Sequence, residues 1–292
     1  MRAETHTRRI KESAPKEPAL EELLRAMGLR CAPFSPEEKS HELFPVPSQR
    51  ECLSLLDTTA ALRGVMLLTG SPGVGKSSVM KTWVAGLEPK RFLPVLITQS
   101  SLSATGVLEF LLAKLGLRPG FKRSTNLLLL EKHLAELDPL TLVLVLDDAQ
   151  NYSGPALEEL RLLLGLGGGR RSAFALILLG DEYLLTSLRL SVQRALLSRI
   201  SASARLGALA REEIASYLNW HISRAGLDRE MFEPAAVDML AEASEGNPRT
   251  LGLLAQAAWL EAARRNSLTI EAADIHKALR QVPAATLKLQ TP

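Results

Sequence analysis

The chain has 292 residues, which is enough for one large domain or two modest ones, each with its own apolar core. Hydrophobic residues make up 46% of it and aromatic residues only 4%, so we expect an interior of Leu, Ala and Val. The formal charge of +3 is too small by itself to indicate an anionic partner. Cys31 and Cys52 have no paired or metal-binding spacing, which argues against a disulfide framework and a structural zinc site.

Residues 1–18 are charged and contain two prolines but few apolar side chains, so we expect a flexible tail there. They hold no apolar segment of the kind found in signal peptides. No run elsewhere reaches the roughly 20 apolar residues that a spanning helix requires. The sequence therefore predicts a cytoplasmic protein with no membrane partner.

Strand and helix patterns alternate along the first two thirds of the chain. Helices are expected at 19–28 and from Ser48, where Glu51 completes a capping box, and the first strand at 65–69. Further along come a helix at 75–87, a strand at 92–98, helices at 107–115 and 127–137, a strand at 141–146, a helix containing Pro155 and a strand at 174–179. This order predicts an α/β fold, with a parallel sheet covered by helices on both faces.

After residue 204 only helical periodicity remains, at 211–225, 234–245, 248–263 and 270–279. We therefore expect a nucleotide-binding α/β domain over 19–204, a small all-helical domain over 205–281 and an unpatterned C-terminal tail over 282–292.

A glycine-rich motif follows the first predicted strand and opens a helix. It matches G-x-x-x-x-G-K-[ST], the phosphate-binding loop also called Walker A, whose backbone N–H groups surround the phosphates of a nucleotide. Lys76 is expected to reach the β- and γ-phosphates and Ser77 to ligate Mg²⁺. A glycine-rich turn with a solvated lysine is the alternative, and the flanking strand and helix argue against it. The expected cofactors are ATP and Mg²⁺, and the binding residues are Gly70, Ser71, Pro72, Gly73, Val74, Gly75, Lys76, Ser77 and Ser78.

Two acids end the apolar run 142–146, as in a Walker B strand. Ligands of open α/β sheets bind beyond the carboxyl ends of the strands, so Asp147 and Asp148 should face the phosphate loop of the neighbouring strand. Asp147 would hold Mg²⁺ through water, and Asp148 would orient and deprotonate the attacking water. Alternatively, Asp148 only caps a loop. Asp is one methylene shorter than the Glu of many ATPases, so we expect slow, regulatory ATP hydrolysis.

Several short motifs occur in the order typical of one family. They are Gly28-Leu29-Arg30, Pro33-Phe34, the phosphate loop, Leu146-Asp147-Asp148-Ala149-Gln150, Leu178-Leu179-Gly180, Ser198-Arg199-Ile200 and Gly246-Asn247-Pro248-Arg249. Over about residues 20 to 280 the chain thereby resembles the AAA+ ATPases, and among them the ExeA-type group that includes the transposition regulators TnsC, MuB and IstB. The resemblance implies a P-loop AAA+ sheet followed by a helical lid domain.

The resemblance also implies roles for single residues. Arg249 matches the sensor-2 arginine that touches the γ-phosphate within one subunit. Arg199 is our first choice for the arginine finger that completes a neighbour's site, with Arg194 as the alternative; a surface charge or a helix-end ion pair would also explain either residue. Asp181 stands where the family has a polar amide or hydroxyl, and this places the first sensor in doubt.

The resemblance implies double-stranded DNA as a partner, bound without strong sequence preference. The candidate contacts are basic pairs in two loops, Lys122 with Arg123 and Arg170 with Arg171. We find no usefully interleaved aromatic residue, and solvated loops explain these pairs equally well.

The implied function is regulation of DNA transposition. The chain would assemble with ATP on DNA as a homo-oligomeric ring or filament, select a target, and recruit or activate a transposase, possibly with a target-selection protein. The alternatives are an ExeA-like secretion-assembly ATPase and a nucleotide-gated loader or signalling module with little hydrolysis.

Overall fold

The computed structural model describes residues 19–35, 42–99, 101–168, 171–190 and 193–283. These residues form two compact units. The α/β unit lies within Glu37–Ala210 and Glu245–Thr250, and the helical unit within Met1–Pro36, Arg211–Ser244 and Leu251–Pro292. None of the helices in the described part of the chain is both long and apolar enough to span a bilayer.

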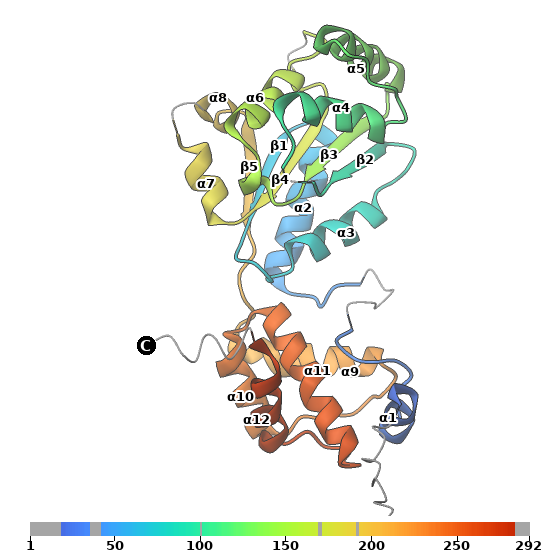
Figure 1. The fold of residues 1–292 in the computed structure, drawn as a ribbon, viewed down its shortest axis with the longest axis vertical. Coiled ribbons are helices and arrows are strands. Elements are labelled where there is room, and N and C mark those ends of the chain that lie inside the picture. The colour runs from blue at the N-terminus through green and yellow to red at the C-terminus, as the bar shows by residue number, and fades with distance from the viewer. Residues whose placement is uncertain (1–18, 36–41, 100, 169–170, 191–192, 284–292) are drawn as a thin grey trace, which may run out of the picture. The chain divides into compact units, whose positions relative to one another are not determined.

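The α/β unit is built on a five-stranded parallel sheet (Figure 1). Its strand order is β2-β3-β4-β1-β5. The strands are β1 (Val65–Thr69), β2 (Phe92–Ile97), β3 (Thr141–Leu146), β4 (Ala175–Gly180) and β5 (Ile200–Arg205). The predicted α/β fold class, a parallel sheet covered by helices on both faces, is confirmed.

Alternating side chains of the central strands enter two separate cores. Leu142, Leu144 and Leu146 of β3 pack in one cluster, with Leu108 of α4 (Ala104–Lys114) and Leu157 of α6 (Gly154–Leu163). Val143 and Val145 face the other cluster, which includes apolar residues of α2 (Pro47–Leu62) and α3 (Lys76–Gly86). Because every residue of β3 is buried, the strand is an uninterrupted apolar run from Leu142 onward. The remaining helical elements of this unit are α5 (Arg123–Leu137), η1 (Ala149–Asn151), α7 (Glu182–Leu188) and α8 (Arg194–Leu197).

The strand order corrects one expectation about the site. Asp147 was expected to face the phosphate loop from a neighbouring strand, but β3 does not pair with β1. Strand β4 lies between them, with Leu176 paired both to Val65 of β1 and to Leu144 of β3. The acids after β3 therefore approach the loop across the end of β4.

Two local expectations also differ from the structure. The strand β5 was missed because its sequence, Ile-Ser-Ala-Ser-Ala-Arg, alternates between half-buried and exposed positions at the edge of the sheet and has no apolar run. The capping box of Ser48 and Glu51 is absent from α2, which begins at Pro47 after Val46 and has no side-chain cap. A proline at the first helical position begins the helix instead.

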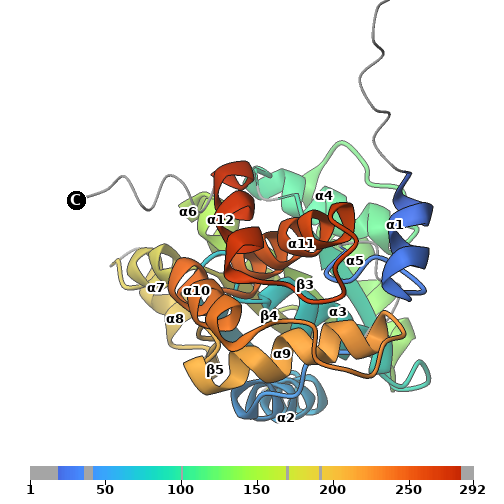
Figure 2. The same cartoon turned by 90° about the horizontal axis from the view of Figure 1, so that it is seen from below.

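The helical unit contains α1 (Leu20–Met27), α9 (Arg211–Arg224), α10 (Pro234–Ser244), most of α11 (Pro248–Arg264) and α12 (Ala272–Gln281) (Figure 2). The segment around α1 was expected in the nucleotide-binding domain, but it groups with this unit. The Arg30 N–H donates to the Ala225 carbonyl at 2.7 Å, and the Phe34 and His221 rings lie 4.9 Å apart. Residues 245–250 group with the α/β unit, so the start of α11 belongs with the phosphate loop.

Candidate nucleotide-binding site

The backbone of the phosphate loop needs its glycines. Gly73 and Gly75 have φ angles of 90° and 99°, which other L-residues rarely adopt. At Gly70 a Cβ would lie 2.4 Å from the Leu206 carbonyl oxygen. The backbone N–H of Leu206 donates to the Thr69 carbonyl at 2.8 Å. The loop is thus held between β1 and the chain leaving β5, and α3 begins within it at Lys76.

The Lys76 side chain is buried beneath this loop. Its Nζ donates to the Gly70 carbonyl at 2.6 Å and to the Ser71 carbonyl at 3.2 Å. Burial lowers the pKa of Lys76 because it penalises the charged ammonium, and the carboxylates of Asp147, Asp148 and Asp181 oppose that shift. Phosphates bound in the loop would supply the missing counter-charge.

Ser77 and Asp147 join the phosphate loop to the end of β3. The Ser77 hydroxyl donates to Asp147 Oδ2 at 2.9 Å, and Asp147 Oδ1 accepts from the Asp148 N–H at 3.0 Å. One hydroxyl and one carboxylate fit Mg²⁺, which takes a few protein oxygens and completes its shell with phosphate and water. Within the described ranges no three His, Cys, Asp or Glu residues cluster as a metal site.

Asp148 lies in a left-handed backbone conformation, with φ 50° and ψ 44°, which is uncommon outside glycine. The Gln150 side-chain amide donates to Asp148 Oδ1 at 3.1 Å, while its oxygen accepts from the Asp181 N–H at 3.3 Å. The Asp181 carboxylate accepts from the Tyr183 N–H at 2.9 Å and caps α7. Sequence reasoning quoted Gln150 within a motif but gave it no role.

Asn247 fastens the segment before α11 to the phosphate loop. Its Nδ2 donates to the Pro72 carbonyl at 2.8 Å, and its Oδ1 accepts from the N–H groups of Arg249 and Thr250 at 3.1 and 3.3 Å. The Arg249 N–H also lies 3.2 Å from the Gly73 carbonyl. A Cβ at Gly73 would meet Asn247 Oδ1 at 2.5 Å. Arg249, the predicted sensor-2 arginine, is therefore anchored to the loop by its backbone, and the role of Asn247 was missed.

Arg199, the first-choice arginine finger, lies away from this site. Arg199 precedes Ile200, the residue of β5 that pairs with Val65 at the start of β1, whereas Arg205 pairs with Thr69 beside the loop. Five strand residues separate the two ends by roughly 17 Å. Arg205 itself forms an ion pair with Glu182 of α7. Arg194 is the first residue of α8. Arg199 is thus too far from the phosphate loop of its own subunit to act there.

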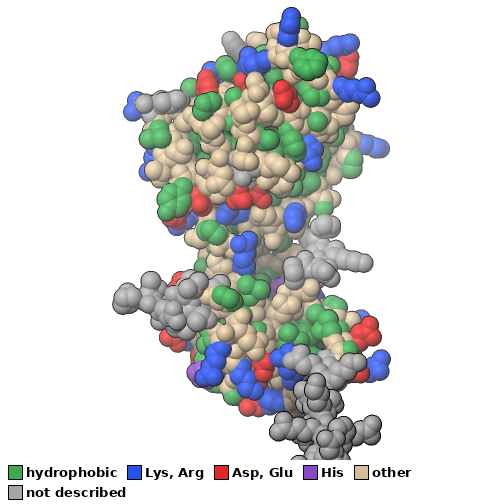
Figure 3. Space-filling model, viewed as in Figure 1, with side chains coloured by type: hydrophobic (Ala, Val, Ile, Leu, Met, Phe, Trp, Pro, Cys, Tyr) green, Lys and Arg blue, Asp and Glu red, His purple; other side chains and the backbone are tan. Residues whose placement is uncertain are grey.

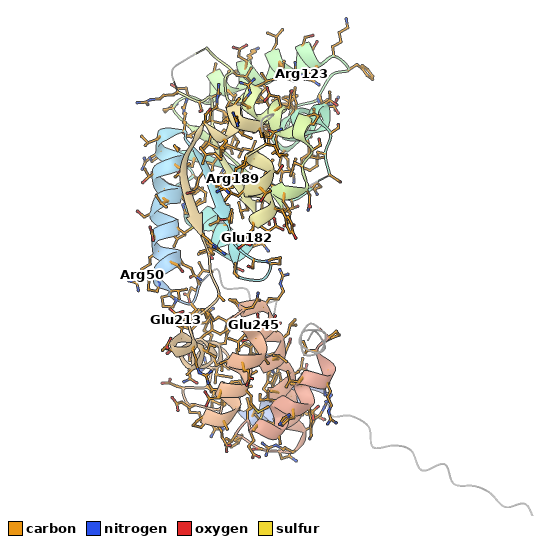
Figure 4. All side chains as sticks on the ribbon, turned by 90° about the vertical axis from the view of Figure 1, so that its left-hand side faces the viewer. Arg50, Arg123, Glu182, Arg189, Glu213 and Glu245 are labelled. Atoms are coloured by element: carbon orange, nitrogen blue, oxygen red, sulfur yellow. The ribbon has the colours of Figure 1, made fainter. Side chains whose placement is uncertain are left out.

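The predicted DNA contacts are spread over the α/β unit. Lys122 is the N-cap residue of α5 and Arg123, labelled in Figure 4, begins the helix, so neither lies in a loop. The Arg123 guanidinium makes two hydrogen bonds, 3.2 and 2.8 Å, with the buried Glu159 carboxylate. Arg171 is exposed, and Arg170 lies outside the described residues. Phe121, beside Lys122, is fully exposed and was overlooked as an interleaved aromatic residue. On the face seen in Figure 3, described Lys and Arg side chains are dispersed among acidic ones.

The fold is that of the P-loop AAA+ proteins, a class whose members generally bind and hydrolyse ATP and typically use Mg²⁺. Residues 60–188 match the family described as AAA domain. The chain is 29% identical over 265 residues to General secretion pathway protein A of Aeromonas hydrophila. That match covers 87% of the chain but spans only about half, 47%, of the relative.

Solved structures share the fold. Cdc6p from Pyrobaculum aerophilum superposes with a TM-score of 0.65 at 23% identity, covering 89% of this chain and 73% of that one. The Aeropyrum pernix ORC1 protein, solved in complex with DNA, gives 0.63 at 16% identity, with coverages of 85% and 68%. These findings support an AAA+ ATPase, and the narrower likeness to TnsC, MuB and IstB stays a prediction.

Proposed function

We propose that the chain is a slow ATPase whose nucleotide state controls its assembly on double-stranded DNA. The observation that carries this proposal is the 2.9 Å hydrogen bond between Ser77 and Asp147, which brings the phosphate loop and the acidic strand end to one place. Gly70 to Ser78 would hold the phosphates of ATP, and Ser77 with Asp147 would hold Mg²⁺, which neutralises phosphate charge when bound.

ATP hydrolysis requires a positioned water molecule and stabilisation of the charge on the transferred phosphoryl group. Asp148 would accept the proton of the attacking water, and Lys76 would stabilise charge on the transferred phosphoryl group. Arg249 would add a second cation from the same subunit, because its backbone is already bound to Gly73. The short Asp148 side chain, already engaged by Gln150, supports slow turnover.

In this proposal a second copy of the chain completes the site. Arg199 lies at the opposite end of β5 from the phosphate loop, so it would serve a neighbouring subunit, with Arg194 as the alternative. An arginine from a neighbour makes ATP a link between subunits. ATP binding would then favour a ring or filament and hydrolysis would release it.

Two observations support assembly on DNA. The chain shares its fold with the ORC1 protein that was solved in complex with DNA, and Lys122 and Arg171 are exposed cations. Within this proposal the oligomer regulates transposition by selecting a target and recruiting a transposase. A second candidate, a part in secretion assembly, is favoured by the similarity to General secretion pathway protein A.

Electron microscopy of the purified chain tests the choice. Samples would contain ATP and Mg²⁺, with and without duplex DNA and with and without lipid vesicles. Rings or filaments that need both ATP and DNA support the proposed function. Assembly on vesicles alone, or a monomer under every condition, would count against it, and the first of these outcomes would favour the secretion candidate.

A further inference from the structure

A basic hollow lies at the end of the sheet where the strands begin, opposite the end that carries the phosphate loop. We call this the N-terminal edge of the sheet. The hollow has a volume of about 400 Å³, and residues that precede four of the five strands line it. Arg63 precedes β1, Lys90 and Arg91 precede β2, Asp138 and Thr141 lie at the start of β3, and Arg171 precedes β4. Of the lining residues only Arg171 was singled out in the sequence, and the nucleotide site uses none of them.

Four cations and one acid face this hollow. Arg63 and Asp138 form part of its wall, because Arg63 Nη2 lies 3.2 Å from Asp138 Oδ1 and Arg63 Nε donates to the Thr141 hydroxyl at 3.4 Å. Arg91 has a long ion pair with Glu88, at 3.8 Å, and lies over the Phe92 ring. Among the described residues, the side chains of Lys90 and Arg171 contact no acidic group.

Helix ends explain only part of this charge. The helices α2 and α5 both end at the N-terminal edge of the sheet, and the carbonyl groups of a last turn attract cations. Arg63 is the C-cap residue of α2, so it supplies a cation at the end of that helix. Lys90, Arg91 and Arg171 lie outside the last turns of these helices, and all three line one hollow whose only acidic lining residue is Asp138. Like charges that share a hollow repel one another. An anionic ligand would remove that repulsion.

We propose that this hollow is a second phosphate-binding site and that its ligand is the phosphodiester backbone of duplex DNA. Guanidinium and ammonium groups are the usual partners of phosphate oxygens. Lys90, Arg91 and Arg171 are exposed, so an extended polymer can reach them, and contacts of this kind position DNA without reading its sequence. The inference rests on the proposed binding of DNA, and it moves the contact from Lys122 and Arg123 to the hollow.

Fluorescence anisotropy with a short labelled duplex tests this site over a range of salt concentrations. In a Lys90→Ala/Arg171→Ala variant we expect duplex affinity to fall roughly tenfold or more, and the slope of log affinity against log salt to fall by about 1.8, or about 0.9 for each lost contact. A Lys81→Ala/Arg189→Ala variant removes the same charge from exposed positions outside the hollow and should bind as the parent does. Both variants should keep the parent's affinity for ATP.

The outcomes separate this inference from the proposed function. If the parent binds no duplex, the proposed function fails and the inference falls with it. If the parent binds duplex and the Lys90→Ala/Arg171→Ala variant binds equally well, only the hollow is excluded. Inorganic tripolyphosphate serves as the free-phosphate probe. A variant that loses tripolyphosphate binding but keeps full duplex affinity would also overturn DNA as the ligand.

Discussion

The side-chain amide of Gln150 donates a hydrogen bond to the Asp148 carboxylate at 3.1 Å. The same side chain accepts from the backbone N–H of Asp181, the residue that stands at the first sensor position. The Asp181 carboxylate caps α7 instead of facing outward as a free anion. The neutral amide of Gln150 therefore lies between Asp148, the candidate base, and Asp181. At the position of Asp181 the family resemblance implies a polar amide or hydroxyl.

We predict that Gln150→Ala lowers kcat for ATP hydrolysis by on the order of tenfold, because Asp148 loses the group that orients it. ATP affinity should stay within about twofold, since the Gln150 side chain hydrogen-bonds to Asp148 and Asp181 and not to the phosphate loop. Steady-state kinetics and equilibrium binding of labelled ATP would measure the two quantities. A Ser153→Ala variant, which removes a nearby helix cap, is the control. An unchanged kcat would show that Gln150 has no part in positioning Asp148.

Asp148→Asn should retain ATP binding and abolish turnover. The amide keeps the size of the carboxylate but cannot accept a proton from water. Phosphate release and binding of labelled ATP would be measured on the same preparation. Asp181→Asn is the matched control, because an amide oxygen can still cap α7 and turnover should stay within a few-fold of the parent. Phosphate release at the parent's rate in Asp148→Asn would remove Asp148 from the mechanism.

Lys76→Met separates nucleotide binding from stability. ATP affinity should fall at least tenfold with the loss of the ammonium. The free energy of unfolding without nucleotide should stay within about 1 kcal/mol of the parent's or exceed it, because the variant no longer buries a charge.

The pH dependence of that stability has a defined sign. Burial lowers the folded-state pKa of Lys76 below its ordinary value of 10.5. Stability linked to this group is therefore complete above 10.5 and is lost as pH falls through the lowered pKa. Denaturant unfolding at neutral pH and at about pH 10 should shift in favour of the parent as pH rises. A constant difference between parent and variant would contradict the lowered pKa of Lys76.

Asn247→Ser should weaken ATP binding while leaving stability within about 1 kcal/mol of the parent. The serine hydroxyl can still cap α11, but it is too short to reach the Pro72 carbonyl, so the phosphate loop loses that support. Asn247→Ala removes the cap as well and should be less stable than Asn247→Ser by about 1 kcal/mol. Binding of labelled ATP and denaturant unfolding measure both effects. Parent-like ATP affinity in Asn247→Ser would argue that this contact only caps the helix.

Arg199 can be tested by mixing two inactive variants. Arg199→Ala should lower ATP turnover by on the order of a thousandfold, and Lys76→Ala should abolish it. In a mixture, an intact phosphate loop in one subunit meets an intact Arg199 in its neighbour, so turnover should recover in part. The same mixture made with Arg194→Ala tests the alternative finger. No recovery in the Arg199→Ala mixture, with recovery in the Arg194→Ala mixture, would assign the role to Arg194.

The sequence indicates buried features of this fold better than contacts between distant segments. The strand β1 and the run ending in Asp147 were placed correctly, because strands buried on both faces are apolar throughout. The strand β5 was missed because an edge strand needs no such run. The position of β4 between β1 and β3 could not be predicted from any local stretch of sequence. Strand order depends on contacts between segments that are distant in the chain.

The site shows the same division. The phosphate loop is a local motif, and its expected residues are found together at the end of β1. The hydrogen bond from Asn247 to Pro72 joins positions 175 residues apart, and the pairing of Arg123 with Glu159 depends on where the fold places α5 relative to α6. Neither spacing nor periodicity carries such information, so these contacts become visible only in the folded chain.

The tight approach of Gly73 to Asn247 constrains how this protein can change during evolution. Any side chain at position 73 would enter the space of the Asn247 amide, and a larger residue at position 247 would press on the loop at Gly73. Substitutions that are harmful singly can be tolerated when both positions change together. Among relatives that keep this loop we therefore expect positions 73 and 247 to covary, although a long stretch of chain separates them.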